Sequence, residues 1–247
     1  MQTTFMINLY QKANLKGKNL IEYKLQLQKK GFSQEQKDIL VGTLLGDASM
    51  EFTKDHQNSN IKWEQNISNK AYINHIYEKF YEWVGIPPEI RDIKGGNALN
   101  RQSIWFKTYK HSSLNFFKHQ FYKNKPIGLG ENGTKQYKVV PKLIHNWLTP
   151  RALAYWYMDD GSFNNKGRDY HLHTQGFNLE HVEILCQTLN KNYNIKCNLH
   201  KDRGKYKLYI LKQSNEIFKQ TVRERTHPCF LYKIHSHSKG NPEETNK

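Results

Sequence analysis

The sequence has few cysteines, and their spacing excludes several classes of site. Cys186, Cys197 and Cys229 form neither a CxxC pair nor a zinc-binding framework. They indicate reduced thiols in an intracellular compartment. No apolar run approaches the roughly 18 residues of a membrane-spanning helix, so we expect no membrane partner. The first 30 residues contain neither the arginine nor the serine expected of a mitochondrial targeting peptide.

Acidic residues are also scarce relative to basic ones. The chain of 247 residues has 38 Lys and Arg against 22 Asp and Glu, a net charge of +16. Solubility asks for a net charge of only about 2 to 8 in a small domain. Because polyphosphates are common ligands of strongly basic proteins, the excess indicates a nucleic-acid partner, with solubility alone as the alternative. The aromatic content of 13% excludes wholesale disorder and indicates a packed core.

Two apolar runs, residues 40–48 and 153–161, each contain a carboxylate near the end, Asp47 and Asp160. Each run is long enough for about two helical turns. A carboxylate in the last turn of a helix opposes the helix dipole and therefore favours a compensating cation. Two such ends side by side make an acidic basin suited to a divalent metal ion. The alternative is a pair of core helices that end in chance aspartates.

The two runs differ in the residues that face a neighbouring helix. Gly42 and Gly46 lie on one face of the first run, where glycine suggests the close approach of another backbone. Tyr155 and Asp159 occupy the corresponding positions of the second run. If the two helices pack together, we expect an asymmetric contact.

Both runs resemble the LAGLIDADG motif of homing endonucleases, and two copies in one chain resemble its monomeric, pseudo-symmetric branch. The resemblance covers about residues 20–234, including 146–150 just before the second motif. It implies an α+β fold of two pseudo-symmetric αββαββα halves that pack through their LAGLIDADG helices. The antiparallel sheets of such a fold form a DNA-binding saddle.

The pattern of elements also predicts a repeat: helix, two strands, helix, two strands, helix, read twice. Capping signals place helix starts after Ser33 with Gln36, Asn69, Thr149 and Asn178. The expected strands are 50–54, 61–67, 90–93, 103–109, 161–164, 170–176, 196–200 and 206–211. We divide the chain into a basic N-terminal arm (1–32), a first half (33–122), a linker with a basic-pocket lysine (123–148), a second half (149–235) and a polar tail (236–247).

The resemblance places the metal-binding acid of each motif at Asp47 and Asp160. The backbone carbonyls of Gly46 and Asp159 are further candidate ligands for Mg²⁺ or Mn²⁺. By resemblance, Lys138 and Lys233 are the basic-pocket lysines that stabilise transition-state charge or order the attacking water. These residues are the predicted catalytic and metal-binding site.

DNA contacts are expected on the strands, because an antiparallel ribbon can enter the major groove and present alternate side chains to base edges. The candidates are the long polar residues of the expected strands and their ends. They are Lys54, Lys62, Glu64, Asn66, Arg91, Lys94, Arg101, Lys107, His171, His173, Gln175, Asn198, Lys201, Lys205 and Lys207.

The predicted function is a monomeric homing endonuclease that cuts a long, asymmetric double-stranded DNA site. The family resemblance implies cleavage across the minor groove with short 3′ overhangs, which initiates intron or mobile-element transfer. One alternative is an intron RNA maturase on the same fold, and another is a DNA-binding protein that has lost cleavage. The abundance of Asn and Lys fits an A/T-rich coding sequence, so we expect an organelle, mitochondrion or plastid.

Overall fold

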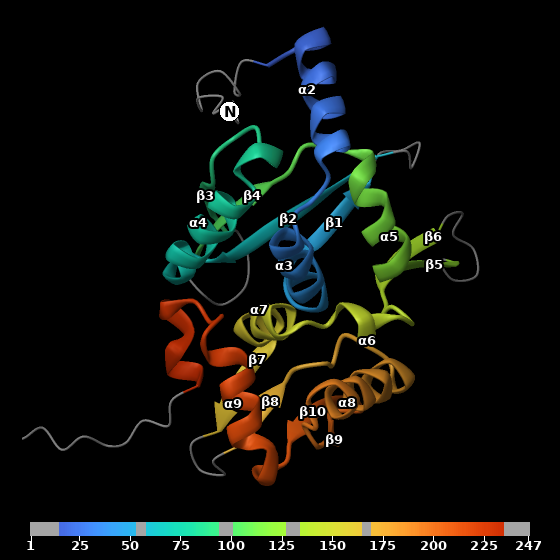
Figure 1. Ribbon diagram of the computed structural model, residues 1–247, viewed down its shortest axis with the longest axis vertical. Helices are drawn as coiled ribbons and strands as arrows, with labels where there is room; N and C mark the ends of the chain where they lie inside the picture. The colour runs from blue at the N-terminus through green and yellow to red at the C-terminus, as the bar shows by residue number, and fades with distance from the viewer. Residues whose placement is uncertain (1–14, 53–57, 94–100, 127–133, 165–168, 235–247) are drawn as a thin grey trace, which may run out of the picture. The chain divides into compact units, whose positions relative to one another are not determined.

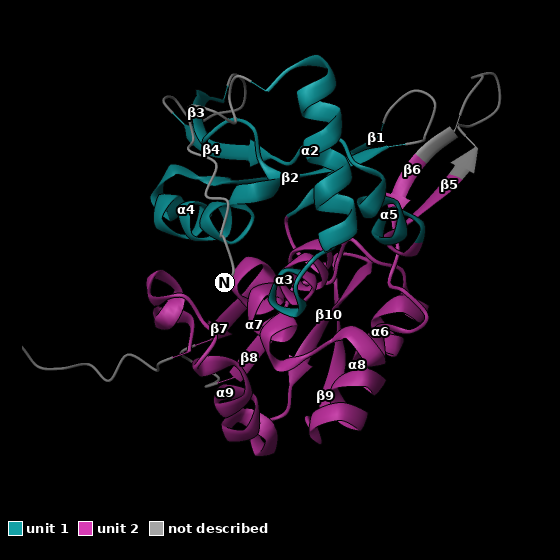
Figure 2. Ribbon diagram, turned by 45° about the horizontal axis from the view of Figure 1, so that its top comes forward, with its two compact units in different colours: residues 1–36, 48–119 teal, residues 37–47, 120–247 magenta. Residues whose placement is uncertain are grey.

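The computed structural model describes residues 15–52, 58–93, 101–126, 134–164 and 169–234, and the chain folds into two compact units (Figures 1 and 2). Unit 1 holds residues 1–36 and 48–119, and unit 2 holds residues 37–47 and 120–247. Helix α3 (Gln34–Leu45) begins in unit 1 and continues into unit 2. Residues 40–47 of the first apolar run, which include Asp47, therefore belong to the same unit as the second run.

Unit 1 is built on a four-stranded antiparallel sheet in the order β1-β2-β4-β3. Its strands are β1 (Ser49–Phe52), β2 (Ser59–Asn66), β3 (Glu89–Asp92) and β4 (Gln102–Lys107). Its other elements are α2 (Gly17–Lys30), η1 (Ile67–Asn69), α4 (Lys70–Lys79), η2 (Tyr81–Trp83), η3 (Ser112–Leu114) and the start of α5 (Asn115–Phe121).

Alternation along the strands separates a core face of this sheet from a polar face. Trp63 of β2 and Phe106 of β4 are buried and stack with ring centroids 5.0 Å apart. Phe80, directly after α4, packs on Trp63 at 4.9 Å. The residues on either side of Trp63 along β2, Lys62 and Glu64, lie on the opposite face of the sheet.

Unit 2 contains a second four-stranded antiparallel sheet, in the order β7-β8-β10-β9. Its strands are β7 (Gly161–Asn164), β8 (Asp169–Leu172), β9 (Cys197–Asp202) and β10 (Lys205–Ile210). Its other elements are β5 (Tyr122–Pro126), β6 (Thr134–Lys138), α6 (Ile144–Trp147), α7 (Pro150–Asp160), α8 (Leu179–Tyr193), η4 (Lys212–Ser214), α9 (Asn215–Arg223) and η5 (Pro228–Lys233).

Helices cover one face of the second sheet (Figure 1). Tyr170 of β8 packs against Tyr157 of α7 and Phe218 of α9, with ring centroids 6.0 and 5.1 Å away. Leu172 of β8 and Leu208 of β10 are fully buried on the same side. As in unit 1, the other face of the sheet carries polar side chains.

The two sheets have the same topology, because each is ordered first, second, fourth and third along its own segment. Each sheet also follows a helix that carries most of one apolar run: α3 precedes the first sheet, and α7 precedes the second. The predicted repeat and the α+β fold class are therefore confirmed. No helix in the described ranges is long and apolar enough to cross a membrane.

The structure differs from the expected elements in several places; the expected strand 170–176, for example, is the shorter β8 and ends at Leu172. Residues 17–30 of the expected arm form helix α2, whose Tyr23 and Leu27 are buried. The expected linker loop contains the hairpin β5–β6, whose strands pair from Tyr122 with Lys138 to Pro126 with Thr134. Asn69 is not a side-chain cap, because its amide contacts Gln65 instead. The hairpin strands carry no apolar alternation, so the sequence offered little strand signal there.

Candidate active site and DNA-facing surfaces

The helix ends that carry the two carboxylates are brought together by the contact between α3 and α7. A Cβ atom added to Gly42 would lie 2.3 Å from the backbone oxygen of Ala152 and 2.7 Å from Cβ of Tyr155. A Cβ atom on Gly46 would lie 2.5 Å from Cβ of Asp159. Each glycine therefore faces a larger residue of α7, which is the asymmetric contact that the sequence predicted.

Local capping fixes where both helices begin. The Ser33 hydroxyl accepts a hydrogen bond from the Gln36 N–H at 3.1 Å, and the Gln36 side chain accepts one from the Ser33 N–H at 3.0 Å. This is the capping box predicted for the first helix. Thr149 caps α7 by accepting from the Ala152 N–H at 3.1 Å, and Pro150 follows at the first helical position.

Asp160 is the last residue of α7 and is partly buried, whereas Asp47 lies just beyond α3 and is exposed. Burial, and to a lesser extent the negative charge of Asp47, raises the pKa of Asp160 to about 7. Lys138 and Lys233 act in the opposite direction on the same pKa. The charge of Asp47 therefore acts on Asp160 across the two helix ends.

The Asp159 side chain lies at the helix contact, as its position in the second run predicted. Its carboxylate oxygen Oδ2 accepts a hydrogen bond from the backbone N–H of Asp47 at 3.2 Å. The contact is possible because Gly46 leaves room for the Asp159 side chain. This side-chain contact positions Asp47, while the backbone carbonyl of Asp159 stays a predicted metal ligand.

The two candidate lysines both approach the helix ends. Lys138, the last residue of β6, donates from Nζ to the Gly46 carbonyl at 2.7 Å. Lys233, the last residue of η5, donates from Nζ to the Met158 carbonyl at 2.6 Å. The Tyr157 hydroxyl donates to the carbonyl of Lys233 at 2.6 Å and so anchors that segment.

Burial lowers the pKa of both lysines, and nearby carboxylates oppose the change. The carboxylate that most strongly opposes the lowering of the pKa is Asp160 for Lys138 and Asp159 for Lys233. The other two of the three aspartates near the helix ends act on each lysine as well. We call the set of Asp47, Asp159, Asp160, Lys138 and Lys233 the helix-end cluster.

The helix-end cluster fits a hard divalent cation that keeps part of its coordination shell for other ligands. Across the described part of the chain, no group of three or more His, Cys, Asp and Glu is arranged as a metal site. Asp47 and Asp160 supply two carboxylates, and Mg²⁺ characteristically takes one or two protein carboxylates together with water and substrate phosphates. The raised pKa of Asp160 supports the fit, since a cation would compensate the charge that burial disfavours.

The polar face of the first sheet carries most of the DNA-contact candidates of unit 1. Glu64 on β2 is contacted by Arg91 at 2.7 Å, by the Ser103 hydroxyl at 2.6 Å and by Lys62 at 2.7 Å. Lys107 approaches Glu51 at 3.3 Å. Because Glu64 holds these donors in fixed positions, the face is a preorganised network rather than a set of loose cations.

The polar face of the second sheet is rich in histidine. His171 approaches Asp169 at 3.1 Å, and His173 approaches the Ser162 hydroxyl at 2.9 Å. Burial lowers the pKa of both histidines, and Lys207 lowers it further. Neutral imidazoles can both donate and accept, so they suit base edges as well as phosphates.

The remaining candidates fall in different places. On the polar faces or next to the ends of their strands lie Asn66, Arg101, Asn198 and Lys205. Gln175 was expected on a strand but lies in the turn after β8, where its side chain donates to Asp202 at 3.0 Å. Lys201 is exposed but lies on the opposite, helix-covered face, because it pairs with Tyr206 while Asn198 pairs with Tyr209. Lys54 and Lys94 lie outside the described residues.

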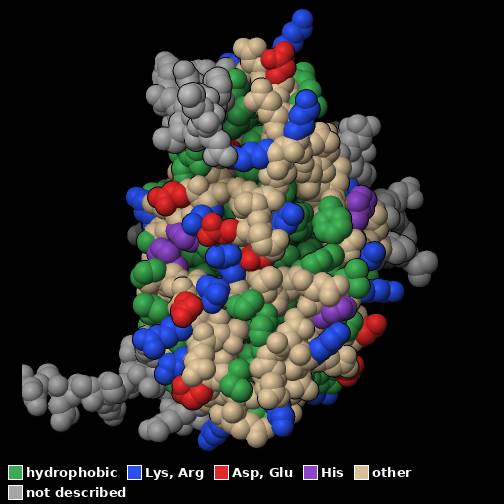
Figure 3. Space-filling model, viewed as in Figure 1, with side chains coloured by type: hydrophobic (Ala, Val, Ile, Leu, Met, Phe, Trp, Pro, Cys, Tyr) green, Lys and Arg blue, Asp and Glu red, His purple; other side chains and the backbone are tan. Residues whose placement is uncertain are grey.

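Two aromatic residues on these faces were missed by the sequence analysis. Trp105 of β4 lies between Lys62 and Lys107, whose Nζ atoms are 5.3 and 5.8 Å from its ring centroid. Tyr209 of β10 stacks on His200 at 4.7 Å. The alternation of side chains along a strand could have revealed both, because Trp105 is two residues from the candidate Lys107 and Tyr209 is two residues from the candidate Lys207. Lys and Arg side chains are also spread widely over the surface drawn in Figure 3.

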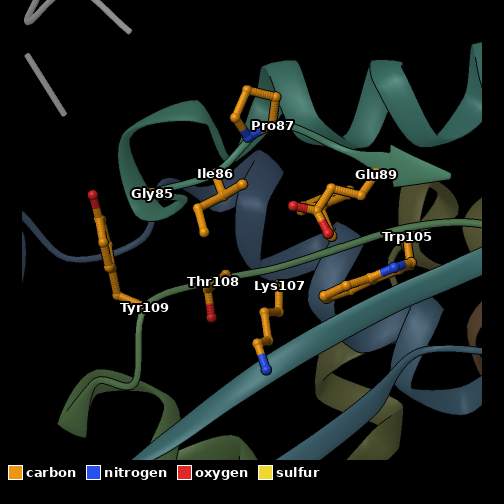
Figure 4. A pocket seen from close by; sticks show the side chains of 9 residues that line it. Gly85, Ile86, Pro87, Glu89, Trp105, Lys107, Thr108 and Tyr109 are labelled. Carbon is orange, nitrogen blue, oxygen red and sulfur yellow. The ribbon is translucent and has the colours of Figure 1, made fainter. Parts of the chain in front are cut away.

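Trp105 also borders a largely apolar pocket of about 230 Å³ in unit 1 (Figure 4). Ile86 and Pro87 line it from the turn before β3, and Glu89 is the cross-strand neighbour of Trp105. Figure 4 shows the Trp105 ring beside the Glu89 carboxylate. The edge of the polar face therefore includes an apolar surface next to charged groups.

Comparisons with known proteins agree with this arrangement. The LAGLIDADG DNA endonuclease family matches residues 37–218. A probable intron-encoded endonuclease of Wickerhamomyces canadensis is 34% identical over 209 residues, which cover 82% of this chain and 84% of that protein. The cytochrome b mRNA maturase bI2 of Debaryomyces hansenii is 31% identical over 211 residues, covering 83% and 75%.

A solved structure matches over almost the whole chain. The homing endonuclease I-WcaI bound to its DNA recognition sequence superposes with a TM-score of 0.80 at 31% identity, covering 93% of this chain and 99% of that one. The duplicated fold and the acids at its helix ends define the class, a site-specific DNA endonuclease. This chain belongs to the LAGLIDADG DNA endonuclease family, and the family predicted from the sequence is confirmed.

Proposed function

We propose that this chain hydrolyses both strands of a long, asymmetric DNA target at the helix-end cluster with Mg²⁺ or Mn²⁺. The observation that carries the proposal is the convergence of Asp47, Asp160, Lys138 and Lys233 within unit 2, although these residues are far apart in sequence. Binding alone does not require two partly compensated carboxylates at the ends of adjacent helices. Cleavage does, because negative charge must be relieved at the phosphate.

Each residue of the cluster has a distinct role in this proposal. Asp47 and Asp160 hold the divalent ion, which when bound supplies charge neutralisation at the phosphate and an acidified water. The backbone carbonyls of Gly46 and Asp159 would be further oxygen ligands for the ion. Lys138 and Lys233 stabilise charge on the phosphate or order the attacking water, one at each helix end. Asp159 keeps the backbone of Asp47 in place.

DNA binding is assigned to the polar faces of the two sheets. Their lysines and arginines contact phosphates, and alternate polar side chains reach base edges in the major groove. In line with the family, the cut falls across the minor groove and leaves short 3′ overhangs. We propose that the protein acts as a monomer in an organelle and that cleavage initiates intron or mobile-element transfer.

The test is incubation of the purified protein with DNA that carries the intronless host junction, with Mg²⁺, with Mn²⁺ and with EDTA. We expect defined double-strand cleavage that EDTA abolishes. Asp47→Asn and Asp160→Asn should each lower the rate at least about 100-fold, because each removes a ligand whose charge is needed in the transition state. Asp92→Asn, which changes an exposed aspartate on β3, is the matched control and should cleave at the normal rate.

The lysines are tested in the same assay against matched neighbours. Lys138→Met should slow cleavage while leaving DNA affinity within about two-fold, whereas Lys142→Met, four residues away and exposed, should leave both unchanged. Lys233→Met is compared with Lys212→Met in the same way. Unchanged cleavage by both Lys138→Met and Lys233→Met would contradict their proposed role.

The second candidate function is assistance in splicing the host intron, which the maturase relative from Debaryomyces hansenii favours. Filter binding and splicing assays with the host intron RNA separate the two. Tight RNA binding and faster splicing without any DNA cleavage would replace the endonuclease proposal by the maturase. A DNA footprint without cleavage in any divalent ion would instead indicate a DNA-binding protein that has lost its activity.

A further inference from the structure

Two cysteines of unit 2 lie in direct contact outside the helix-end cluster. Cys186 is on α8, which packs on the second sheet, and Cys197 is the first residue of β9, the edge strand of that sheet. Their Sγ atoms are 2.7 Å apart, and Cys186 Sγ also lies 3.1 Å from the carbonyl of Cys197. Both residues are free thiols and partly exposed.

We propose that Cys186 and Cys197 form a reversible disulfide, which makes this pair a redox modification site. A disulfide bond is about 2.05 Å long, so the two sulfurs need to approach by only about 0.7 Å. The link joins the centre of α8 to the start of β9 across the short turn after Tyr193. No rearrangement of the sheet is needed, because the pair already bridges the two elements.

The electrostatics of the pair set the order of the reaction. A hydrogen bond from the Cys197 thiol lowers the pKa of Cys186, and the same contact together with burial raises the pKa of Cys197. Cys186 is therefore the thiolate that reacts first. With glutathione disulfide as the oxidant, the Cys186 thiolate attacks one glutathione sulfur, which forms a mixed disulfide and releases one glutathione thiolate.

The second step closes the bond. Cys197 loses its proton and attacks the Cys186 sulfur of the mixed disulfide, so the second glutathione leaves as a thiolate. Overall, two protein thiols are oxidised and one glutathione disulfide is reduced to two glutathione molecules. The chain contains its own reference thiol, because Cys229 lies on η5 and contacts the His227 ring instead of another cysteine.

The bond is expected to stabilise unit 2 without blocking DNA. Cys197 lies on the helix-covered face of β9, whereas its neighbour Asn198 points to the polar face. The disulfide would constrain the unfolded chain over a short loop and raise the thermal midpoint by at least about 4 °C. We expect the DNA cleavage rate of the oxidised protein to stay within about two-fold of that of the reduced protein.

The test equilibrates the folded wild-type protein in buffers of defined glutathione ratio, blocks the remaining thiols with iodoacetamide and maps tryptic peptides by mass spectrometry. Cleavage after Arg168, Lys191, Lys196 and Lys201 places the two cysteines on different peptides, 169–191 and 197–201. We expect these peptides to be joined, with two hydrogens lost, while the peptide of Cys229 is alkylated. Separate alkylation of both peptides at every ratio, or preferential oxidation of Cys229, would overturn the proposal.

Two variants separate the roles of the thiols. In Cys197→Ser, the reaction should stop at a glutathione adduct on Cys186, and the oxidant should no longer raise the thermal midpoint. Cys229→Ser is the matched control and should keep both the link and the rise. If Cys229→Ser abolished the rise while Cys197→Ser retained it, the stabilisation would come from another bond and the proposal would fail.

Discussion

The close contact between α3 and α7 makes a sharp prediction for Gly42→Ala. Helix propensity alone favours the change, because alanine in the interior of a helix is about 1 kcal/mol more favourable than glycine. The structure predicts the opposite sign. The new Cβ would lie 2.3 Å from the Ala152 oxygen, 2.7 Å from Cβ of Tyr155 and 3.1 Å from the Ala152 carbon, whereas ordinary contact begins near 3.4 Å.

Relief of this overlap requires the helices to separate, because the nearest atom is backbone and no side chain can rotate away. The contact at 2.3 Å must lengthen by about 1 Å, and overpacking of a core on this scale costs about 1 to 3 kcal/mol. After the gain in propensity of about 1 kcal/mol, we expect a net loss of about 1 kcal/mol and at most about 2 kcal/mol. Cleavage should fall as well, because each helix end carries one of the two aspartates proposed to bind the metal ion.

Urea unfolding followed by tryptophan fluorescence measures the change, with the cleavage rate of the folded variant as a second readout. Gly176→Ala is the matched control, since nothing lies within 4 Å of its added Cβ and its backbone has no positive φ. Its stability should stay within about 0.5 kcal/mol of the wild type. A Gly42→Ala protein more stable than the wild type, as propensity alone predicts, would refute the close helix contact.

Three further predictions concern single side chains. Without divalent ions, the free energy of unfolding of the wild type should fall as the pH rises from about 4 to 7, relative to that of Asp160→Asn. The reason is that the Asp160 carboxyl ionises near 3.8 in the unfolded chain and only near 7 in the folded one. Urea unfolding should measure a loss of at most about 4 kcal/mol. Thr149→Ala removes the N-cap of α7 and should lower stability by about 1 kcal/mol in the same assay. Trp105→Ala should relax the preference at one or two base pairs about ten-fold in cleavage profiling of randomised targets, since a mismatch typically costs 1–3 kcal/mol; an unchanged profile would place Trp105 outside the DNA contact.

The elements of this fold were largely predictable because their signals are local. The capping box at Ser33 and the caps Thr149 and Asn178 each form the predicted hydrogen bond. The strand β7 begins and ends where the pattern placed it. Asn69 failed as a cap because its amide has a competing partner in Gln65, which only the folded chain brings near.

The faces of the strands were harder to predict, because a shift of one residue moves a side chain to the other side of the sheet. Lys201 was grouped with Asn198 although three positions separate them, and an odd separation within one strand places two residues on opposite faces. Trp105 was passed over because an aromatic residue in a strand usually belongs to the core. Its register opposite Glu64 and Glu89 assigns it to the polar face instead.

The contacts between side chains could not be predicted from the sequence for a different reason. The lysine candidates came from the family resemblance, which gives positions along the chain but no contacts. Lys138 meets the Gly46 carbonyl only because the β5–β6 hairpin delivers it there, and that hairpin was expected to be a loop. The hydrogen bond from Asp47 to Asp159 depends on the space that Gly46 leaves, which motif alignment alone does not reveal.

The same space explains why the two motif helices are not interchangeable. Gly42 of α3 faces Tyr155 of α7, and Gly46, directly after α3, faces Asp159, so each small residue is matched by a larger one. Two copies of α3 in such a contact would leave voids at both glycines, which lose packing energy. Two copies of α7 would bring tyrosine against tyrosine and one Asp159 against the other, with overlap and like-charge repulsion. Each helix therefore fits the other better than it would fit a copy of itself, which is the asymmetry that the sequence predicted for this contact.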